Sequence, residues 1–296
     1  MKAMKKLVIP LFVAFAYGPA QGLAAPILAA DLASFAVLAA AGVTNVPIST
    51  IGGNLGSSPN PSVGGGYIFT SGSLQPGNQA QAQLDLDAAI ITLSAFGVGT
   101  NTGSDLDAYQ AAHGGTIIPG TYTVAAVTTP NLEGNLILDG GGSNSALWVF
   151  QFPSTLITGT TSHVTVQNIG DGANVGLYWN VHSAATLNGP TFAGNVLADA
   201  LISSDGNLTV ACGRLLSATG QVTLIQDSIS ITGCAAPGST GFGSGGFDQG
   251  VAIGSGGTGG SGGTVVGGVP EPVTLLLFGI GLTGLFTFRK KLFSVA

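Results

Sequence analysis

The chain has 296 residues, of which 45% are hydrophobic and 7% are charged, and its formal net charge is −6. Arg214 is the one basic residue outside the two ends of the chain; the six others are Lys2, Lys5, Lys6, Arg289, Lys290 and Lys291. Nucleic acid and anionic membrane surfaces need more cations in a partner, so both are excluded as partners. A surface of Thr, Ser, Asn, Gln, Gly and small apolar groups instead suits a large, neutral, hydrogen-bonding partner.

Residues 1–24 predict a secretory signal peptide. A basic start precedes the apolar run Leu7–Tyr17, and small residues follow that run. A transmembrane anchor is the alternative, but the run is short and Pro10 interrupts it. We therefore expect cleavage near Ala24 and an exported mature chain.

Residues 25–234 have one consistent character, which predicts a single domain. Glycines there alternate with short runs of Val, Leu, Ile and Thr, a composition typical of short strands joined by tight turns. The low charge and high hydrophobic content argue against disorder. Residues 235–268 are dominated by Gly and Ser and predict a flexible linker.

One amphipathic helix is expected inside the domain, at Asn78–Phe96, which contains neither Gly nor Pro. Apolar residues at helical spacing predict its core-facing stripe. The stripe consists of Leu84, Ala88, Ile91 and Ala95, widened by Leu86, Ile90 and Leu93. A second short helical turn is expected around Asp105–Ala112.

The rest of the domain predicts a mainly β fold built from strands of a few residues each. The clearest strands are Ala146–Phe152, His163–Gln167, Gly176–Val181, Asn195–Ser203, Gly213–Ser217 and Gln221–Ile225. An aromatic-rich strand, a corner of small residues and a short second strand recur imperfectly along the chain. Repeats of roughly twenty to thirty residues with short strands are typical of a β-solenoid.

Cys212 and Cys234 are the only cysteines. In an exported protein such a pair predicts a disulfide, here closing a loop of about twenty residues and contributing roughly 3 kcal/mol. A metal site is disfavoured because the three histidines, His113, His163 and His182, are scattered. No Gly-x-Ser-x-Gly nucleophile elbow is present in the domain, residues 25–234, so we expect no enzyme, no catalytic residue and no cofactor.

The C-terminal tail, residues 269–296, contains Pro270, Glu271 and Pro272, then the apolar run Val273–Phe288, then a basic cluster. This order resembles the PEP-CTERM sorting signal of Gram-negative bacteria. The resemblance implies an exosortase-type enzyme that processes the tail, and a secreted or cell-surface domain that has crossed the inner membrane. A plain single-pass anchor is the alternative, since the cations favour the cytoplasmic side.

Over residues 28–234 the chain resembles the secreted ice-binding proteins of bacteria, diatoms and fungi. The segments that carry the resemblance are Leu32–Ala39, Ile51–Pro59, the Ala/Gln-rich helix, Ile118–Tyr122, the strand at Trp148, Gly213–Leu216 and Val222–Leu224. The resemblance implies a right-handed, discontinuous β-solenoid of triangular section with one long α-helix packed alongside.

The alternation of strand residues then places a candidate ice-binding face. If Leu156, Ala185, Ile202 and Val222 point inward, their neighbours point outward. The predicted face is Thr155, Ile157, Ala184, Thr186, Leu201, Ser203, Gln221 and Thr223. The family's Thr-rich pattern is degraded here, and the alternative is that these are merely exposed residues of high β propensity.

The leading hypothesis is therefore an ice-binding protein that adsorbs to ice through this uncharged Thr/Ser/Ala-rich face and inhibits ice growth or recrystallisation. The alternative is an extracellular matrix or adhesion protein whose partner is a neutral exopolysaccharide. Carbohydrate binding favours exposed aromatic residues, whereas Trp148, Tyr178 and Trp179 lie in strands that we expect to be buried. A β-solenoid lyase would need more basic residues than Arg214.

Overall fold

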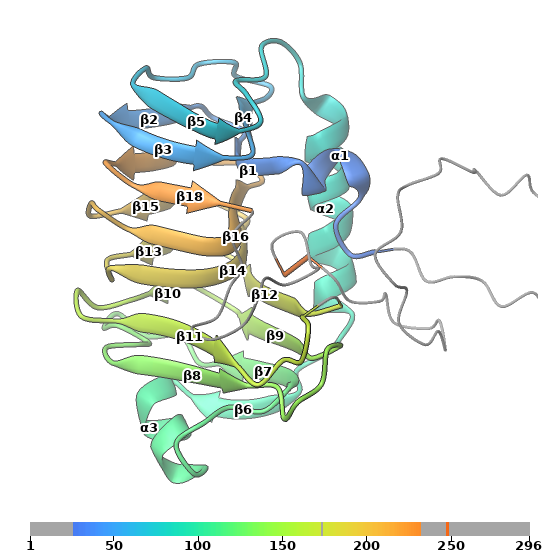
Figure 1. Cartoon of the computed structure of the whole chain (residues 1–296), viewed down its shortest axis with the longest axis vertical. Helices are drawn as coiled ribbons and strands as arrows, with labels where there is room; N and C mark the ends of the chain where they lie inside the picture. Colours follow the sequence, from blue (N-terminus) through green and yellow to red (C-terminus); the bar gives the residue numbers. More distant parts are fainter. Residues whose placement is uncertain (1–25, 173, 232–246, 249–296) are drawn as a thin grey trace, which may run out of the picture. The chain divides into compact units, whose positions relative to one another are not determined.

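The structure is a computed structural model that describes residues 26–172, 174–231 and 247–248 (Figure 1). The predicted signal peptide, the sorting motif with Pro270, Glu271 and Pro272, and nearly all of the predicted linker lie outside these residues. Phe247 and Asp248 are the exception, because these two linker residues pack against the domain.

The described chain contains three helices and a series of short strands. The helices are α1 (Ala30–Ala33), α2 (Ala80–Ser94) and α3 (Leu106–Ala112). The strands are β1 (Phe35–Ala39), β2 (Val43–Val46), β3 (Ser49–Gly52), β4 (Asn54–Ser57), β5 (Tyr67–Ser71), β6 (Thr100–Gly103), β7 (Gly120–Val124), β8 (Asn135–Asp139), β9 (Leu147–Phe152), β10 (Leu156–Ile157), β11 (His163–Gln167), β12 (Gly176–Val181), β13 (Ala185–Leu187), β14 (Thr191–Ala198), β15 (Ile202–Ser204), β16 (Thr209–Ser217), β17 (Val222–Ile225) and β18 (Ser228–Ser230).

These strands pair in parallel and form stacked coils. The larger sheet runs in the order β5-β3-β18-β16-β14-β12-β9-β7-β6, with β1, β4, β8 and β11 joining it at its sides, and the smaller sheet runs β10-β13-β15-β17-β2. The mainly β prediction is confirmed. The handedness of the solenoid and its triangular section stay predictions.

The stacking order departs from the chain order at one place. β1, β2 and β3, from the start of the domain, pair with β16, β17 and β18, from its end. Figure 1 shows these N-terminal strands, in blue, above the C-terminal ones, in orange. The sheets are therefore continuous in space although the sequence that forms them is not.

The interior of the coils is apolar and contains a column of aromatic rings. Tyr122, Phe150, Trp179 and Phe192 stack from coil to coil, with ring centroids 5.4, 4.4 and 4.8 Å apart. The indole Nε1 of Trp179 donates to the carbonyl of Ala193 at 2.9 Å, so its buried polar atom is satisfied. The aromatic residues expected to be buried are indeed buried, and they offer no exposed platform for a sugar ring.

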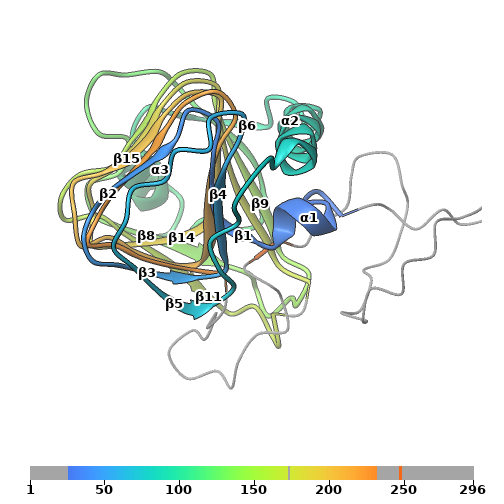
Figure 2. The same ribbon diagram turned by 90° about the horizontal axis from the view of Figure 1, so that it is seen from above.

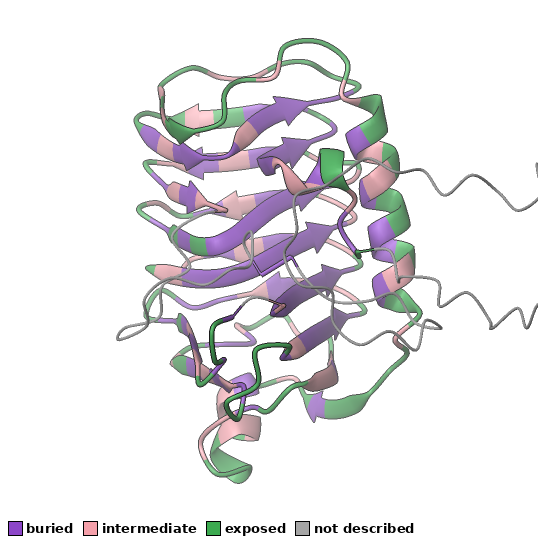
Figure 3. Cartoon of the chain, turned by 45° about the vertical axis from the view of Figure 1, so that its right-hand side comes forward, coloured by how far each residue is buried: buried purple, intermediate pink, exposed green. Residues whose placement is uncertain are grey.

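Helix α2 lies outside the coils, along the face made by β9, β12, β14 and β16 (Figure 2). The helix Ala80–Ser94 lies within the predicted range, and the three residues predicted to widen the core-facing stripe are buried, but its four central residues are exposed. Leu84 and Ile91 are 61% and 70% exposed, whereas Leu86 and Leu93 are fully buried against the sheet. Figure 3 shows this division, with one side of the helix exposed and the other buried. Both sides of the helix are apolar, so spacing alone could not choose between them.

Strand boundaries differ from the predicted ones where the chain turns a corner. The predicted strand Asn195–Ser203 is two strands, β14 and β15, separated by a corner at residues 199–201. The predicted Gly213–Ser217 is the end of a longer strand, β16, which begins at Thr209.

Cys212 is buried and has a positive φ of 55° within β16. None of the described cysteines is free. Cys234 lies outside the described residues, so the Cys212–Cys234 pairing stays a prediction.

Candidate functional site

The smaller sheet brings the predicted inward residues into exact register across four strands. Leu156 pairs with Ala185, Ala185 with Ile202, and Ile202 with Val222. All four side chains are fully buried. The residues on either side of them therefore face away from the interior.

The first outward row follows these inward residues in the sequence. Ile157 pairs with Thr186, Thr186 with Ser203, and Ser203 with Thr223. Each of these four residues is half-buried. We call this row, Ile157, Thr186, Ser203 and Thr223, the upper row.

The second outward row precedes the inward residues and consists of Thr155, Ala184, Leu201 and Gln221. Their backbones lie side by side: the amide of Leu156 donates to the carbonyl of Ala184 at 3.1 Å, and the amide of Ile202 to the carbonyl of Gln221 at 3.0 Å. We call these four residues the lower row. The eight predicted residues thus occupy one face of one sheet.

Strand β2 adds a residue that the sequence analysis missed. Thr44 pairs with Thr223, and its Oγ1 lies 3.0 Å from the Oγ1 of Thr223, so it extends the upper row to a fifth strand. Thr44 is exposed and directly follows the buried Val43, and such an alternation of buried and exposed residues indicates a strand. Its place beside Thr223 depends on the non-sequential stacking of the coils.

The two rows carry hydroxyl, amide, methyl and larger alkyl groups. No charged residue belongs to either row, and the charged residues nearest in sequence lie in the corners before and after the strands. Asp199 lies in the corner before Leu201, and Asp205 follows the buried Ser204. Arg214 is only 1% exposed, so the described part of the chain presents no Lys or Arg side chain to solvent. The face can therefore hydrogen-bond and contact apolar groups but cannot attract anions.

A serine, a histidine and an aspartate meet at one corner of the molecule. His182 Nε2 lies 3.3 Å from Ser94 Oγ, and His182 Nδ1 lies 3.2 Å from Asp199 Oδ2. The Ser94 hydroxyl, however, donates to the carbonyl of Ile90 at 2.8 Å. Ser94 is also the last residue of α2, where the helix dipole is negative and disfavours an oxyanion. This arrangement therefore fits an anchor for the helix better than a hydrolytic centre.

Two buried amides complete that anchor. Gln151 Nε2 donates to the carbonyl of Leu93 at 2.6 Å, while Asn180 Nδ2 donates to Gln151 Oε1 at 2.8 Å and to Ser94 Oγ at 3.1 Å. In the described ranges no three His, Cys, Asp or Glu side chains gather as metal ligands would. None of the described helices is long and apolar enough to cross a membrane.

Comparison with known proteins gives two family matches. Residues 37–230 match the family described as ice-binding-like, and residues 268–291 match the PEP-CTERM protein-sorting motif. An ice-binding protein of Nostoc sp. (strain HG1) is 33% identical over 299 residues, which covers 97% of this chain and 96% of that protein. Ice-binding protein K3-B1 of Typhula ishikariensis is 26% identical over 57% of this chain and 76% of its own.

Solved structures with a similar fold are also ice-binding proteins. The crystal structure from the Antarctic ascomycete Antarctomyces psychrotrophicus has 29% identity and a TM-score of 0.56, covering 69% of this chain and 97% of its own. That of an ice-binding protein from an Antarctic biological consortium has 26% identity and a TM-score of 0.56, covering 76% and 96%.

Proposed function

Because the chain belongs to the ice-binding-like protein family, we propose that it adsorbs to ice through the upper and lower rows of its smaller sheet, with Thr44 included. The observation that carries this proposal is the register of the sheet. It aligns uncharged outward residues across five neighbouring strands, on a domain that exposes no described Lys or Arg side chain.

The mechanism follows from the regular spacing of these rows. Neighbouring strands lie about 4.8 Å apart, so the hydroxyl, amide and alkyl groups of each row follow one another at that interval. Hydroxyls can hold bridging waters, and the apolar groups between them order the adjacent water. Adsorbed protein would then restrain the growth or recrystallisation of ice. A charged side chain within a row would bind its own hydration shell and disturb this order.

The sorting motif supports a place of action outside the inner membrane of a Gram-negative bacterium. We propose that an exosortase-type enzyme processes the tail, and that the domain is then released or kept at the cell surface. A lasting single-pass anchor would give the same face the same access to ice. In neither state does adsorption to ice require a cofactor or a catalytic step by this protein.

Substitutions within the upper row test the ice-binding face. We expect Thr44→Tyr, Thr186→Tyr and Thr223→Tyr each to lower ice recrystallisation inhibition by the exported protein at least about tenfold. A tenfold change corresponds to a loss of roughly 1.4 kcal/mol in the free energy of adsorption. The bulky ring would lift the flat face from the ice. The measurement is the lowest protein concentration that stops recrystallisation.

Thr209→Tyr is the matched control, because Thr209 is an exposed strand residue of the larger sheet. Equal losses in Thr209→Tyr and the three face variants would show unfolding or a different face. If all three face variants still inhibited recrystallisation, the protein would bind ice through a different surface. An unsubstituted protein with no activity at micromolar concentration would contradict the proposal and favour the neutral exopolysaccharide as partner.

A further inference from the structure

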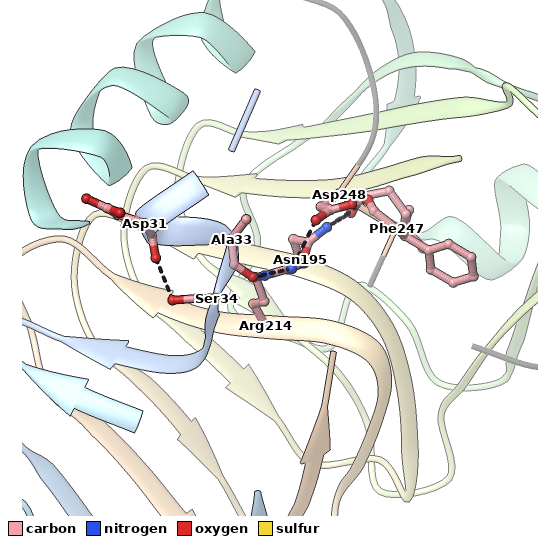
Figure 4. Close-up of polar contacts among 8 residues, drawn as sticks. Asp31, Ala33, Ser34, Asn195, Arg214, Phe247 and Asp248 are labelled. Atoms are coloured by element: carbon pink, nitrogen blue, oxygen red, sulfur yellow. Dashed lines mark hydrogen bonds and ion pairs between the residues drawn. The ribbon is translucent and has the colours of Figure 1, made fainter. Parts of the chain in front are cut away.

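The side chain of Arg214 is buried in the wall of the domain rather than exposed to solvent. Its Nη1 donates to Asn195 Oδ1 at 2.8 Å, and its Nε and Nη2 donate to the carbonyl of Ala33 at 3.1 and 2.6 Å (Figure 4). These acceptors are neutral. Burial lowers the pKa of the guanidinium, and the nearby Asp248 carboxylate opposes that shift.

Asp248 supplies the negative charge for this site from far along the chain. Its Oδ2 lies 3.1 Å from Arg214 Nη2, and its side chain is only 11% exposed. The two charges are therefore paired where water cannot screen them well, and removing one would leave the other buried without its partner.

Phe247, next to it, is held by both its backbone and its ring. Its carbonyl accepts from the amide of Leu177 at 3.0 Å and from Asn195 Nδ2 at 2.9 Å. Its side chain is 3% exposed and belongs to the main hydrophobic core. Asp248 forms an antiparallel bridge with Gly176, although the named strands of the domain pair in parallel.

The place where these two residues dock is an interruption in the larger sheet. β14 pairs with β11 at Thr191 and with β12 from Asn195 onward, so its neighbour changes from one strand to another within a few residues. Phe247 and Asp248 contact the start of β12 and Asn195 at this change. They therefore lie at the interruption, and the bridge between Asp248 and Gly176 is not part of the parallel ladder.

We propose that Phe247 and Asp248 form a strap that completes the folded domain, and that the hydrolytic step which frees the domain from its sorting tail therefore cuts beyond Asp248. Water would add across a peptide bond C-terminal to Asp248, leaving a carboxylate on the domain and an amine on the tail. The second part rests on the proposed processing of the tail. The domain thus ends at residue 248 rather than at 234.

The strap itself is tested by thermal unfolding of the protein without its signal peptide. We expect Phe247→Ala and Asp248→Ala each to lower the Tm by at least about 6 °C, because one opens a cavity and the other removes the carboxylate that pairs with the buried Arg214. Asp87→Asn, at an exposed aspartate of α2, is the control and should leave the Tm unchanged. Unchanged Tm values in both strap variants would overturn the strap.

A second pair of variants separates charge pairing from general damage. In the Asp248→Ala background, Arg214→Met should lower the Tm by less than it does in the wild type, because the ion pair between the two side chains is already absent. Arg214→Met alone should lower the Tm, since it leaves Asp248 without its cation. A loss in the double variant that equals the sum of the two single losses would contradict the pairing.

The processing step is tested by the mass of the mature protein exported from a Gram-negative host that contains an exosortase-type enzyme. We expect a C-terminal residue at or beyond 248. A mature protein that ends within residues 232–246 and keeps the full Tm would overturn the proposal. Protein that retains its whole tail would overturn the processing step, while the Tm of the strap variants would still decide the strap.

Discussion

Asp227 is a buried carboxylate that joins three corners of neighbouring coils beside the candidate face. Its oxygens accept from the Ser204 hydroxyl at 2.5 Å and from the amides of Leu208 and Ile225, both at 2.9 Å. Its own amide donates to the hydroxyl of Ser49 at 3.0 Å. A single residue therefore fixes the exit of the chain from β17 relative to β15 and β3.

Burial raises the pKa of Asp227 in the folded protein, and the hydrogen bonds oppose this shift only in part. An acid with a raised folded pKa favours folding in its protonated form. That contribution is present below the unfolded pKa of about 3.9 and is lost as the pH rises through the folded pKa. We expect the free energy of unfolding of the wild type, minus that of Asp227→Asn, to fall as the pH rises from 4 upward.

The measurement is urea unfolding of both proteins at a series of pH values. Asp87→Asn is the control, because its exposed side chain has no such burial. A difference between wild type and Asp227→Asn that stays constant with pH would show that Asp227 does not titrate in this way.

Helix α2 shows what an apolar pattern can and cannot specify at the scale of one element. The absence of Gly and Pro over some nineteen residues is enough to predict a helix there. The choice of its buried side depends on the sheet that it meets: Leu86 and Leu93 pack against Val149, Tyr178 and neighbouring side chains. That surface belongs to strands far along the chain, so no local periodicity could identify it.

The orientation of α2 predicts opposite outcomes for two apolar residues two positions apart. Leu93→Ala should cost about 2–5 kcal/mol of the free energy of unfolding, because it leaves a cavity against the sheet. Ile91→Ala should change it by less than about 0.5 kcal/mol, because Ile91 is 70% exposed. Urea unfolding of the two variants measures both values. The reverse order of losses would show that the side of the helix that carries Ile91 is the buried one.

The candidate face, by contrast, could be read from the sequence within each short strand. A period of two identified Leu156, Ala185, Ile202 and Val222 as inward residues, and their burial confirms that phase. What the pattern could not reveal is the order of the coils. Thr44 was missed for this reason, since it precedes its neighbour Thr223 by 179 residues.

At the scale of the whole molecule, the non-sequential stacking places β17 inside the smaller sheet instead of at its edge. In a solenoid with sequential coils, a strand this late in the chain would be the outermost one and would exchange its amide hydrogens readily. Here β17 lies between β15 and β2, and the amide of Val222 donates to the carbonyl of Gly42 at 3.1 Å. The start of the domain therefore protects its end.

This arrangement predicts a long-range effect of a substitution near the start of the domain. Val43 is 1% exposed and pairs with Val222, so Val43→Ala should loosen the contact between β2 and β17. A loss of about 1.4 kcal/mol would speed hydrogen exchange in residues 222–225 roughly tenfold. Val124 is buried in β7 of the larger sheet, whereas β17 belongs to the smaller sheet. Val124→Ala should therefore speed hydrogen exchange near β7 and leave the exchange of residues 222–225 unchanged. If Val43→Ala changed hydrogen exchange only in residues close to it in the sequence, β2 would not pair with β17. Thr44 would then not belong to the proposed ice-binding face.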